Sequence, residues 1–564
     1  MRRPLLALAT LALIAGSCSA DDPEPEAAPD ETASSSAPES TTTTAEPDPE
    51  PEAVEFELAV DAVVAERVGL AATVTVSANV PVTVRLEAVS DDGHTITSPP
   101  TAATTTDHVL PFLGMRADRT YALSAVAFDT DGTELGRATT DITSGPLIPA
   151  VPDFVFESDP DRVQPGLTFI EFAELGFGEQ VEPGTGFVVD EDGEVVWFYD
   201  AAEMLTSIRL LGDGTFVTNV GQPSTRTVHL DFLGGELGRW HYPGEADEGI
   251  EIAVDEPART PHHDVEFLPN GNLLSLAMIE HPVDEALRQE LCPGDDNEWR
   301  AISDLIVEVE PDTGRVVRTW DLWDVIDIAE LPGTGLCDIQ NLFSTETTRD
   351  WSHANAATYD PVRDQVIVSV RHTDQVIAFE HPDREGRITD VAWILGAGGT
   401  LSVDGEPTYH QHAPQILENG NLLVYDNGNT RPGAEDTGGF GQTPDPDAPE
   451  PYTRVVEYEL DPDAGTARQV WEYRTIDPFD DTLLFSRFVG DANRLPNGNV
   501  LINHGGITNA SAPVDVLVIE VDPDPDSGGE IVMSIDVQGP QGTLFGSFRA
   551  ERIETLFQQA VWAG

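Results

Sequence analysis

Apolar and polar residues alternate with a period of two between about Val54 and Gly145, for example in ATVTVSANVPVTVRLEAV and TYALSAVAFDTDGTELGRATTDI. Such alternation is typical of β-strands with one face in a core and the other in solvent. Asp, Gly and Asn turns separate these segments. The length suits a small β-sandwich. We therefore predict a β-sandwich over residues 54–146, with no candidate active residues in it.

After Pro149 the chain repeats a unit of apolar strand, turn and apolar strand. The five clearest copies are IRLLGDGTFVTNVG, VEFLPNGNLLSLAM, ATYDPVRDQVIVSVRH, PQILENGNLLVYDNG and NRLPNGNVLINHGG, which begin at Ile208, Val265, Ala357, Pro414 and Asn493. Asn-Gly and Asp-Gly turns between apolar runs indicate hairpins, because glycine adopts positive φ at little cost. A second hairpin follows each copy, and the second hairpins end at Trp197, Trp240, Trp320, Trp393, Trp471 and Met533.

Four strands in each of about six units, without strong helical periodicity, predict an all-β fold. We expect a six-bladed β-propeller over residues 147–564, in which the final segment GTLFGSFRAERI completes the first blade. An open all-β solenoid is the alternative. Two inserts, Glu280 to Ala301 and Val325 to Asp350, are expected to form loops over one face.

The N-terminus resembles a bacterial lipoprotein signal peptide. Arg2 and Arg3 precede an apolar run and small residues, and Cys18 follows. We predict a signal peptide over 1–17 and lipidation of Cys18, which gives an extracytoplasmic lipoprotein of the cell envelope with no other contact to the membrane. The alternatives are an ordinary signal peptide with an incidental cysteine and a membrane span, and the apolar run is too short for the span. Residues 18–53, rich in Pro, Glu, Asp, Ser and Thr, predict a disordered tether.

The charge of the chain limits its binding partners, and its cysteine content indicates a disulfide. Asp and Glu number 101 against 29 Lys and Arg, a net charge of −72, which argues against nucleic acid as a partner. Cys292 and Cys337 remain as a pair in an oxidising compartment, where a disulfide is favoured over a metal site. The oligomeric state is left open, with a homodimer as one alternative.

Three histidines share one position in the repeat. His263 and His412 each stand eight residues before a turn glycine, and His353 occupies the corresponding strand start in the unit between them. Strand starts at this register point into the central channel of a propeller. With only 13 histidines in 564 residues, three at one register indicate a site. Asn355 lies on the same side of its strand as His353, and Arg371 ends the adjacent strand.

Three imidazoles and a guanidinium suit either a metal or an anion. Three histidines with an open position form a zinc pattern, but no carboxylate stands clearly at the same register and Arg371 would oppose a cation. Towards a tetrahedral oxyanion, histidine and arginine supply hydrogen-bond donors, and an unprotonated imidazole can act as a nucleophile. The anion interpretation explains more of the residues, so we expect no metal and no cofactor.

Four motifs then resemble the bacterial arylsulfate sulfotransferases: HHDVEFLPNGNLL, HANAATYDP followed by Arg371, QHAPQILENGNLLVYDNG and FRAERI. The resemblance covers roughly residues 147–564. It implies that a sulfuryl group moves from a phenolic sulfate ester to a phenolic acceptor by a ping-pong route through a sulfated histidine, without a nucleotide donor.

Carried over by position, the resemblance assigns a role to each residue. His412 matches the histidine that is transiently sulfated, and His410 is the alternative nucleophile. His353 and Asn355 match the pair that contacts the sulfuryl group, and Arg371 the arginine that neutralises it. His263 matches the remaining channel histidine, with His262 as the alternative. The aromatic residues expected to flank the aryl ring are Phe343, Trp351, Tyr409 and Phe440.

Two other functions compete with this one. A non-catalytic surface propeller could hold an anion or a sulfated glycan in the same channel. A metal-dependent propeller hydrolase could use the three histidines as ligands.

Overall fold

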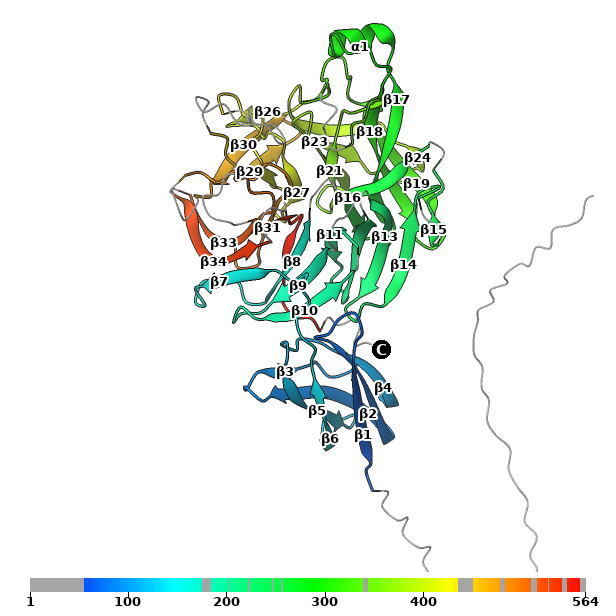
Figure 1. Ribbon diagram of the computed structural model, residues 1–564, viewed down its shortest axis with the longest axis vertical. Coiled ribbons are helices and arrows are strands. Elements are labelled where there is room, and N and C mark those ends of the chain that lie inside the picture. Colours follow the sequence, from blue (N-terminus) through cyan, green and yellow to red (C-terminus); the bar gives the residue numbers. More distant parts are fainter. Residues whose placement is uncertain are drawn as a thin grey trace, which may run out of the picture. The chain divides into compact units, whose positions relative to one another are not determined.

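The computed structural model describes residues 55–174, 184–201, 203–221, 224–245, 248–254, 257–337, 343–434, 450–476, 482–508, 515–525, 527–539 and 545–557. The predicted signal peptide, Cys18 and the whole of the predicted tether lie outside the described residues. From Phe56 onward the chain forms one compact unit, and it is nearly all β-structure (Figure 1). Among the described residues no helix is both long and apolar enough to cross a membrane.

Sheet 1 is built from the period-two segments. Its strands are β1 (Leu58–Val64), β2 (Ala72–Ser90), β3 (Thr95–Thr97), β4 (Thr105–Phe112), β5 (Thr120–Phe128) and β6 (Glu134–Thr143). The first half of the long strand β2 pairs with β1 and β4, and its second half pairs with β3 and β5. Valines and Leu86 on one face of β2 are buried while the residues between them are more exposed, so the strands form where the alternation places them.

Six further sheets of the described chain follow one another along the sequence (Figure 1). Sheet 2 contains β8 (Leu167–Glu174), β9 (Thr185–Val189), β10 (Val195–Asp200), β35 (Phe545–Gly546) and β36 (Ala550–Ile553). Sheet 3 contains β11 (Leu205–Leu210), β12 (Thr215–Gly221), β13 (Ser224–Asp231), β14 (Glu236–His241) and β15 (Ile250–Glu251). Sheet 4 contains β16 (Arg259–Phe267), β17 (Leu273–Pro282), β18 (Arg300–Glu310), β19 (Arg315–Asp321), β20 (Thr348–Asp350) and β24 (Gly386–Arg387).

Sheet 5 contains β21 (Ala354–Asp360), β22 (Gln365–Val370), β23 (Gln375–Glu380) and β25 (Val391–Gly396). Sheet 6 contains β26 (Ser402–Asp404), β27 (His412–Ile416), β28 (Leu422–Asp426), β29 (Arg454–Asp461) and β30 (Thr466–Tyr473). Sheet 7 contains β31 (Asp491–Arg494), β32 (Val500–His504), β33 (Val516–Asp524), β34 (Gly528–Gln538) and β7 (Asp153–Ser158). The described helices are α1 (Glu285–Leu291) and the short 3-10 helix η1 (Leu322–Asp324).

Neighbouring sheets bury a hydrophobic cluster between them, and the series of clusters returns to its start. Sheets 2 and 3, 3 and 4, 4 and 5, 5 and 6, 6 and 7, and finally 7 and 2 each share a cluster of buried side chains. The first strands also lie side by side in this order, from β8 through β11, β16, β21 and β27 to β31. At the ends of the series, β36 pairs with β8, and β7 pairs with β34.

The repeated Asn-Gly turns tie the first and third strands of their sheets together. The residue after each turn glycine donates its side-chain amide to a buried glutamate on the third strand at 2.6 Å, in the pairs Asn272–Glu308, Asn421–Glu457 and Asn499–Glu520. Arg318, Arg494 and Arg552 pair with the same three glutamates. Because a buried carboxylate needs such donors, this arrangement gives a physical reason for the recurring sequence.

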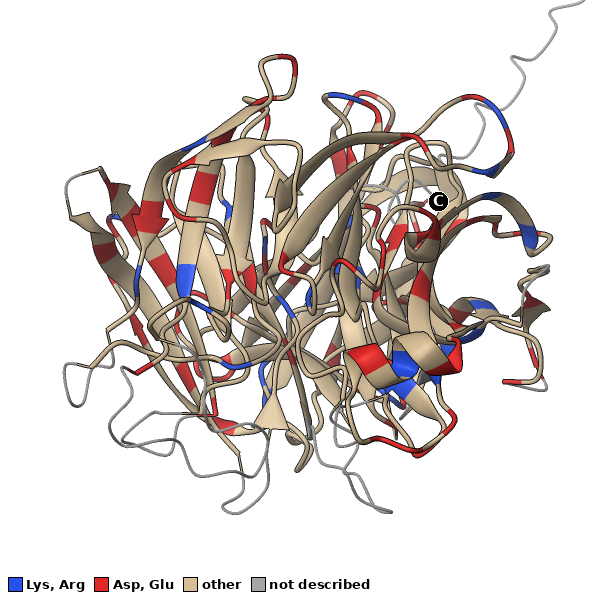
Figure 2. Cartoon of the chain, turned by 90° about the horizontal axis from the view of Figure 1, so that it is seen from above, with Lys and Arg blue, Asp and Glu red and all other residues tan. Residues whose placement is uncertain are grey.

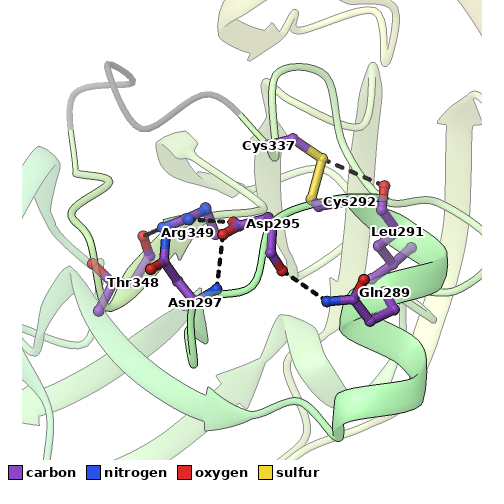
Figure 3. Close-up of a disulfide and its surroundings, with 8 residues drawn as sticks. All are labelled: Gln289, Leu291, Cys292, Asp295, Asn297, Cys337, Thr348 and Arg349. Atoms are coloured by element: carbon purple, nitrogen blue, oxygen red, sulfur yellow. Dashed lines mark hydrogen bonds and ion pairs between the residues drawn. A yellow bond between two sulfur atoms is a disulfide. The ribbon is translucent and has the colours of Figure 1, made fainter.

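A disulfide joins Cys292 to Cys337, whose Cα atoms lie 5.6 Å apart, and so links the two inserts of sheet 4 (Figure 3). Beside the disulfide, Arg349 donates to the Asp295 carboxylate at 2.5 Å. Arg349 belongs to β20, which pairs in parallel with β18 and ends at Asp350. The linked inserts therefore hold in place the segment that leads into His353.

The acidic composition is visible over the described chain. Asp and Glu occur along many strands and loops, whereas Lys and Arg are much sparser (Figure 2). At long range this charge opposes the approach of an anion. Local positive groups are therefore required wherever an anion binds.

Candidate active site

The predicted site residues lie at irregular starts of the first strands of sheets 4, 5 and 6. Pairing shifts register between Pro261 and Val265 in β16, between Ala354 and Ala356 in β21, and after His412 in β27. Such bulges re-aim side chains. His263, His353 and His410 also have φ values of 53°, 50° and 56°, a left-handed conformation that costs energy for residues other than glycine and concentrates at functional sites.

The structure brings three of the predicted histidines around one point. The ring centroids of His263 and His353 lie 4.8 Å apart. Phe548 contacts both His263 and His412. Its ring centroid lies 5.5 Å from that of His263 and 6.2 Å from that of His412. His353 and His412 are more than nine-tenths buried, and His263 is partly buried. Residues at equivalent positions in neighbouring repeats therefore lie close together in the structure.

The doublet at 262 and 263 divides between two surroundings. His263 contacts His353 and Phe548, whereas His262 Nε2 lies 3.2 Å from a carboxylate oxygen of Asp304. The two Nδ1 atoms lie 2.7 Å apart, so one donates a hydrogen to the other. His263 is thus the member of the doublet that faces the other site histidines.

Each site histidine has its Nδ1 atom engaged by a neighbour. His353 Nδ1 lies 2.5 Å from Asp350 Oδ2, and His412 Nδ1 lies 2.6 Å from Asn427 Oδ1. His410 Nδ1 lies 3.0 Å from Asp374 Oδ1, and its main-chain N–H donates to the same oxygen. These contacts orient the rings through Nδ1, which leaves Nε2 as the atom for chemistry.

The imidazoles are held in the neutral form. Burial lowers the pKa of His353 to about 3, and the Arg371 guanidinium acts in the same direction. Burial also lowers the pKa values of His263, His410 and His412 well below the usual range, and Arg371 contributes to each. An unprotonated imidazole carries the lone pair that a nucleophile needs.

Arg371 carries the positive charge that lowers the pKa of each of these imidazoles. It follows β22 directly, and its main-chain N–H donates to His353 O at 3.2 Å. Its side chain donates to the main-chain oxygen of Arg487 at 3.3 Å. A guanidinium beside neutral imidazoles suits an anion better than a cation, although the chain as a whole is strongly acidic.

Asn355 connects the strand of His353 to that of His412. Its side-chain amide donates to the main-chain oxygen of Gln411 at 2.8 Å, and Ser369 donates to the same oxygen. Asn355 Oδ1 is buried and has no hydrogen-bond partner among the described residues. One amide proton of Asn355 therefore holds the neighbouring strand, and the second proton remains for another acceptor.

Sequence reasoning missed several groups of this site. It found no carboxylate near the histidines, but Asp350 lies against His353. It assigned no role to His372, whose ring stacks on His353 at 4.5 Å, or to Asn427 and Phe548. The last two stand inside the quoted motifs, and His372 directly follows Arg371, so sequence proximity was the available signal.

Asp350, His353 and His372 form a group whose ligand atoms lie within 4.8 Å of one another, close enough to hold a metal. The two rings stack at 24° to each other, and Arg371 lowers the pKa of both imidazoles. A positive charge that disfavours protonated histidine also disfavours a metal cation. The electrostatics therefore favour an anion at this place.

The expected aromatic residues lie in different surroundings. Phe343 is in ring contact with His262, His263 and His353 at 5.5–5.8 Å. Trp351 is fully buried in the core between sheets 4 and 5, and Tyr409 lies under the Arg431 guanidinium. Phe440 lies outside the described residues. Phe343 and Phe548 are therefore the aromatic side chains at the histidines.

A separate cavity of about 720 Å³ lies further along the same strands. Arg209, Glu266, Gln415 and Glu551 are among its lining residues. None of the predicted site histidines lines it.

The chain is similar in sequence to proteins of known name. The family model described as Arylsulfotransferase (ASST) matches residues 155–540. The chain is 27% identical over 353 residues to an arylsulfate sulfotransferase AssT of Escherichia coli O6:H1, a match covering 51% of this chain and 52% of that protein. The corresponding AssT of Lelliottia amnigena is 24% identical with the same coverage. The chain thus matches about half the length of these curated relatives.

Solved structures are more distant. A protein of unknown function from Bacteroides caccae has 15% identity and a TM-score of 0.35, covering 68% of this chain and 100% of its own. A periplasmic gluconolactonase of Pseudomonas aeruginosa has 13% identity and a TM-score of 0.32, covering 67% of this chain and 99% of its own.

Proposed function

We propose that this chain, which belongs to the arylsulfotransferase family, transfers a sulfuryl group from a phenolic sulfate ester to a phenolic acceptor through a sulfated histidine. The observation that carries the proposal is the state of His412. This imidazole is buried, and burial and Arg371 keep it unprotonated. Its Nδ1 is bound by Asn427, so Nε2 is the atom available for attack on sulfur.

The fold proposed with this function is a six-bladed β-propeller over residues 147–564, preceded by a β-sandwich over 54–146. The closed series of hydrophobic clusters between sheets 2 to 7 supports the propeller. The pairing of β36 with β8 also supports it, because the C-terminal segment then completes the first sheet of the series. The change of pairing partners along β2 supports the sandwich.

In the first half-reaction the donor presents one negative charge spread over three sulfuryl oxygens. Arg371 and Asn355 donate hydrogen bonds to these oxygens, Arg371 neutralises the charge, and His353 packs against the sulfuryl group. His412 Nε2 forms the N–S bond while the bond from sulfur to the aryl oxygen breaks, and its electron pair leaves on the phenolate oxygen. The neutral His263 stabilises that phenolate with a hydrogen bond, and the phenolate takes its proton from solvent on leaving. Phe343 and Phe548 flank the aryl ring, which their contacts with the histidines support.

The second half-reaction runs through the same groups in reverse. The acceptor phenol gives its proton to His263, and its oxygen attacks sulfur. The N–S electron pair returns to His412 Nε2, and the sulfated acceptor leaves. The first product departs before the acceptor enters, so the kinetics are ping-pong, and no cofactor takes part.

We place the protein outside the cytoplasm, anchored to the membrane only through lipidated Cys18. The disulfide between Cys292 and Cys337 supports an oxidising compartment. The partners in this proposal are the phenolic donor and the phenolic acceptor, and the protein is a homodimer or a monomer.

Steady-state kinetics with 4-nitrophenyl sulfate and a phenol acceptor test the proposal. Nitrophenol release should depend on the acceptor concentration and give parallel double-reciprocal plots. His412→Ala should abolish turnover, whereas His410→Ala should retain it. Turnover by His412→Ala, or release that ignores the acceptor, would overturn the proposal.

A further inference from the structure

Asn427 occupies a position that fixes more than the orientation of His412. It is fully buried, and it immediately follows β28. Its Nδ2 donates to two main-chain oxygens, Ser486 O at 2.8 Å and Val489 O at 3.0 Å. Its Oδ1 lies 2.6 Å from His412 Nδ1.

The two carbonyl partners decide which way the amide faces. A carbonyl oxygen only accepts, so the NH₂ group must face Ser486 and Val489, and the amide oxygen must face His412. An amide oxygen also only accepts, so His412 Nδ1 must carry the hydrogen. The tautomer of His412 therefore has an unprotonated Nε2, because this imidazole is neutral.

The partner of His412 differs in kind from those of its neighbours. His353 faces the carboxylate of Asp350, and His410 faces that of Asp374. A carboxylate can take the Nδ1 proton or stabilise a positively charged ring. The amide of Asn427 does neither to a comparable degree, because it is neutral and does not accept a proton in this pH range.

We propose that Asn427 is a positioning residue that fixes the reactive tautomer of His412 and keeps the sulfated histidine short-lived. This inference rests on the proposed function. When Nε2 forms the N–S bond and the aryl oxygen departs with its electron pair, the ring becomes a sulfoimidazolium that still holds the Nδ1 hydrogen. When the acceptor oxygen attacks sulfur, the N–S pair returns to Nε2 and the leaving group is a neutral imidazole.

Loss of the Nδ1 hydrogen would change the second step. The leaving group would then be an imidazolide anion, which is far more basic than imidazole and leaves poorly. A carboxylate at this position would promote that loss or stabilise the cationic ring. Either effect lengthens the life of the sulfated enzyme, whereas the neutral amide of Asn427 avoids both.

The test compares the full-length wild type with Asn427→Asp and Asn427→Ala. Each protein is mixed with 4-nitrophenyl sulfate without acceptor, and the nitrophenol burst and the intact mass are recorded. Phenol is then added and the loss of the sulfuryl mass is followed over about pH 6 to 9. Asn421→Ala is the matched control, since Asn421 lies in the turn between β27 and β28 and binds Glu457 rather than a histidine.

For Asn427→Asp we expect a sulfated enzyme that forms but transfers its group at least about 10-fold more slowly. The transfer rate should fall further as pH rises and the introduced carboxyl ionises, because the protonated carboxyl resembles the amide. For Asn427→Ala we expect both half-reactions to slow by about 10²-fold, since a histidine held in the wrong tautomer can lose about 10⁴-fold. Asn421→Ala should change thermal stability but neither half-reaction.

Wild-type transfer rates in both Asn427→Asp and Asn427→Ala, over the whole pH range, would overturn the inference while leaving the proposed function intact. Wild-type protein that never gains a sulfuryl group would instead overturn the proposed function and the inference with it. If Asn427→Asp does not fold, the rates of the two half-reactions in Asn427→Ala decide the question.

Discussion

Removal of the Asp264 carboxylate should destabilise the protein strongly, because this group joins several sheets below the histidines. Asp264 is fully buried on β16, directly after His263. It accepts hydrogen bonds from Arg209 and Arg549, both at 2.9 Å, and from Ser207 Oγ at 3.1 Å. It also accepts from the main-chain N–H of Ala357 on β21 at 3.2 Å.

The magnitude follows from what Asp264→Ala leaves behind. Burial acts to raise the pKa of Asp264, but Arg209 and Arg549 together lower it below its ordinary value, so the carboxylate is ionised. Its removal leaves Arg209 and Arg549 without this partner in a buried place. Breaking a buried ion pair from one side costs about 3–5 kcal/mol. Because a unit of this size unfolds with an entropy of about 1 kcal/mol/K, we expect the melting temperature to fall by about 3–5 °C.

Thermal unfolding followed by circular dichroism provides the assay, with Asp522→Ala as the control. Asp522 pairs with Arg162 at 2.8 Å, but both side chains are exposed, so its removal should leave the melting temperature nearly unchanged. Equal, small shifts for the two variants would refute the view that Asp264 holds these sheets together. Because Asp264 adjoins His263, its loss should also lower the transfer rate.

Four further predictions concern the site and its surroundings. Arg371→Ala should lower kcat/KM for aryl sulfates by about 10²–10³-fold and Arg371→Lys by less; unchanged kcat/KM would exclude Arg371 from anion binding. Because burial lowers the pKa of His412, the nitrophenol burst should keep its rate below the ordinary histidine pKa of about 6.5, and a fall centred there would contradict a buried neutral nucleophile. As pH falls over the same range, the free energy of unfolding should decrease, because these histidines bind protons in the unfolded chain but not in the folded one. Replacing Cys292 and Cys337 by serine should cost about 4 kcal/mol for a closed loop of this length, a sequence separation of 45, and raise KM because the linked inserts carry Asp350; unchanged melting and KM would contradict both effects.

The sequence predicted the strands and the positions of the main site residues for a definite reason. The turn glycines set a common register, so His263, His353 and His412 could be placed at equivalent strand starts without knowledge of their distances. The structure gathers these residues, and it adds Asn355 and Arg371 through the neighbouring strand ends. A repeat fixes position within its unit, and equivalent positions in neighbouring units lie close together.

The partners of the histidines could not be predicted in the same way. Phe548 reaches the site because the C-terminal segment returns to sheet 2, and Asp350 arrives at the end of an insert that follows no repeat. Asn427 stands at the end of the strand beside β27, where its amide is fixed by two carbonyls from another segment. The role of Asp264 at the meeting point of several sheets depends on tertiary contacts alone, so the sequence could not predict it.

Intact-protein mass spectrometry of a sulfated intermediate tests the central claim most directly. Wild type, His412→Ala and His410→Ala are each mixed with excess 4-nitrophenyl sulfate and no acceptor. The mechanism predicts one added sulfuryl group and a matching burst of nitrophenol for wild type and His410→Ala, and neither for His412→Ala. A sulfuryl group on His412→Ala, or none on the wild type, would contradict it.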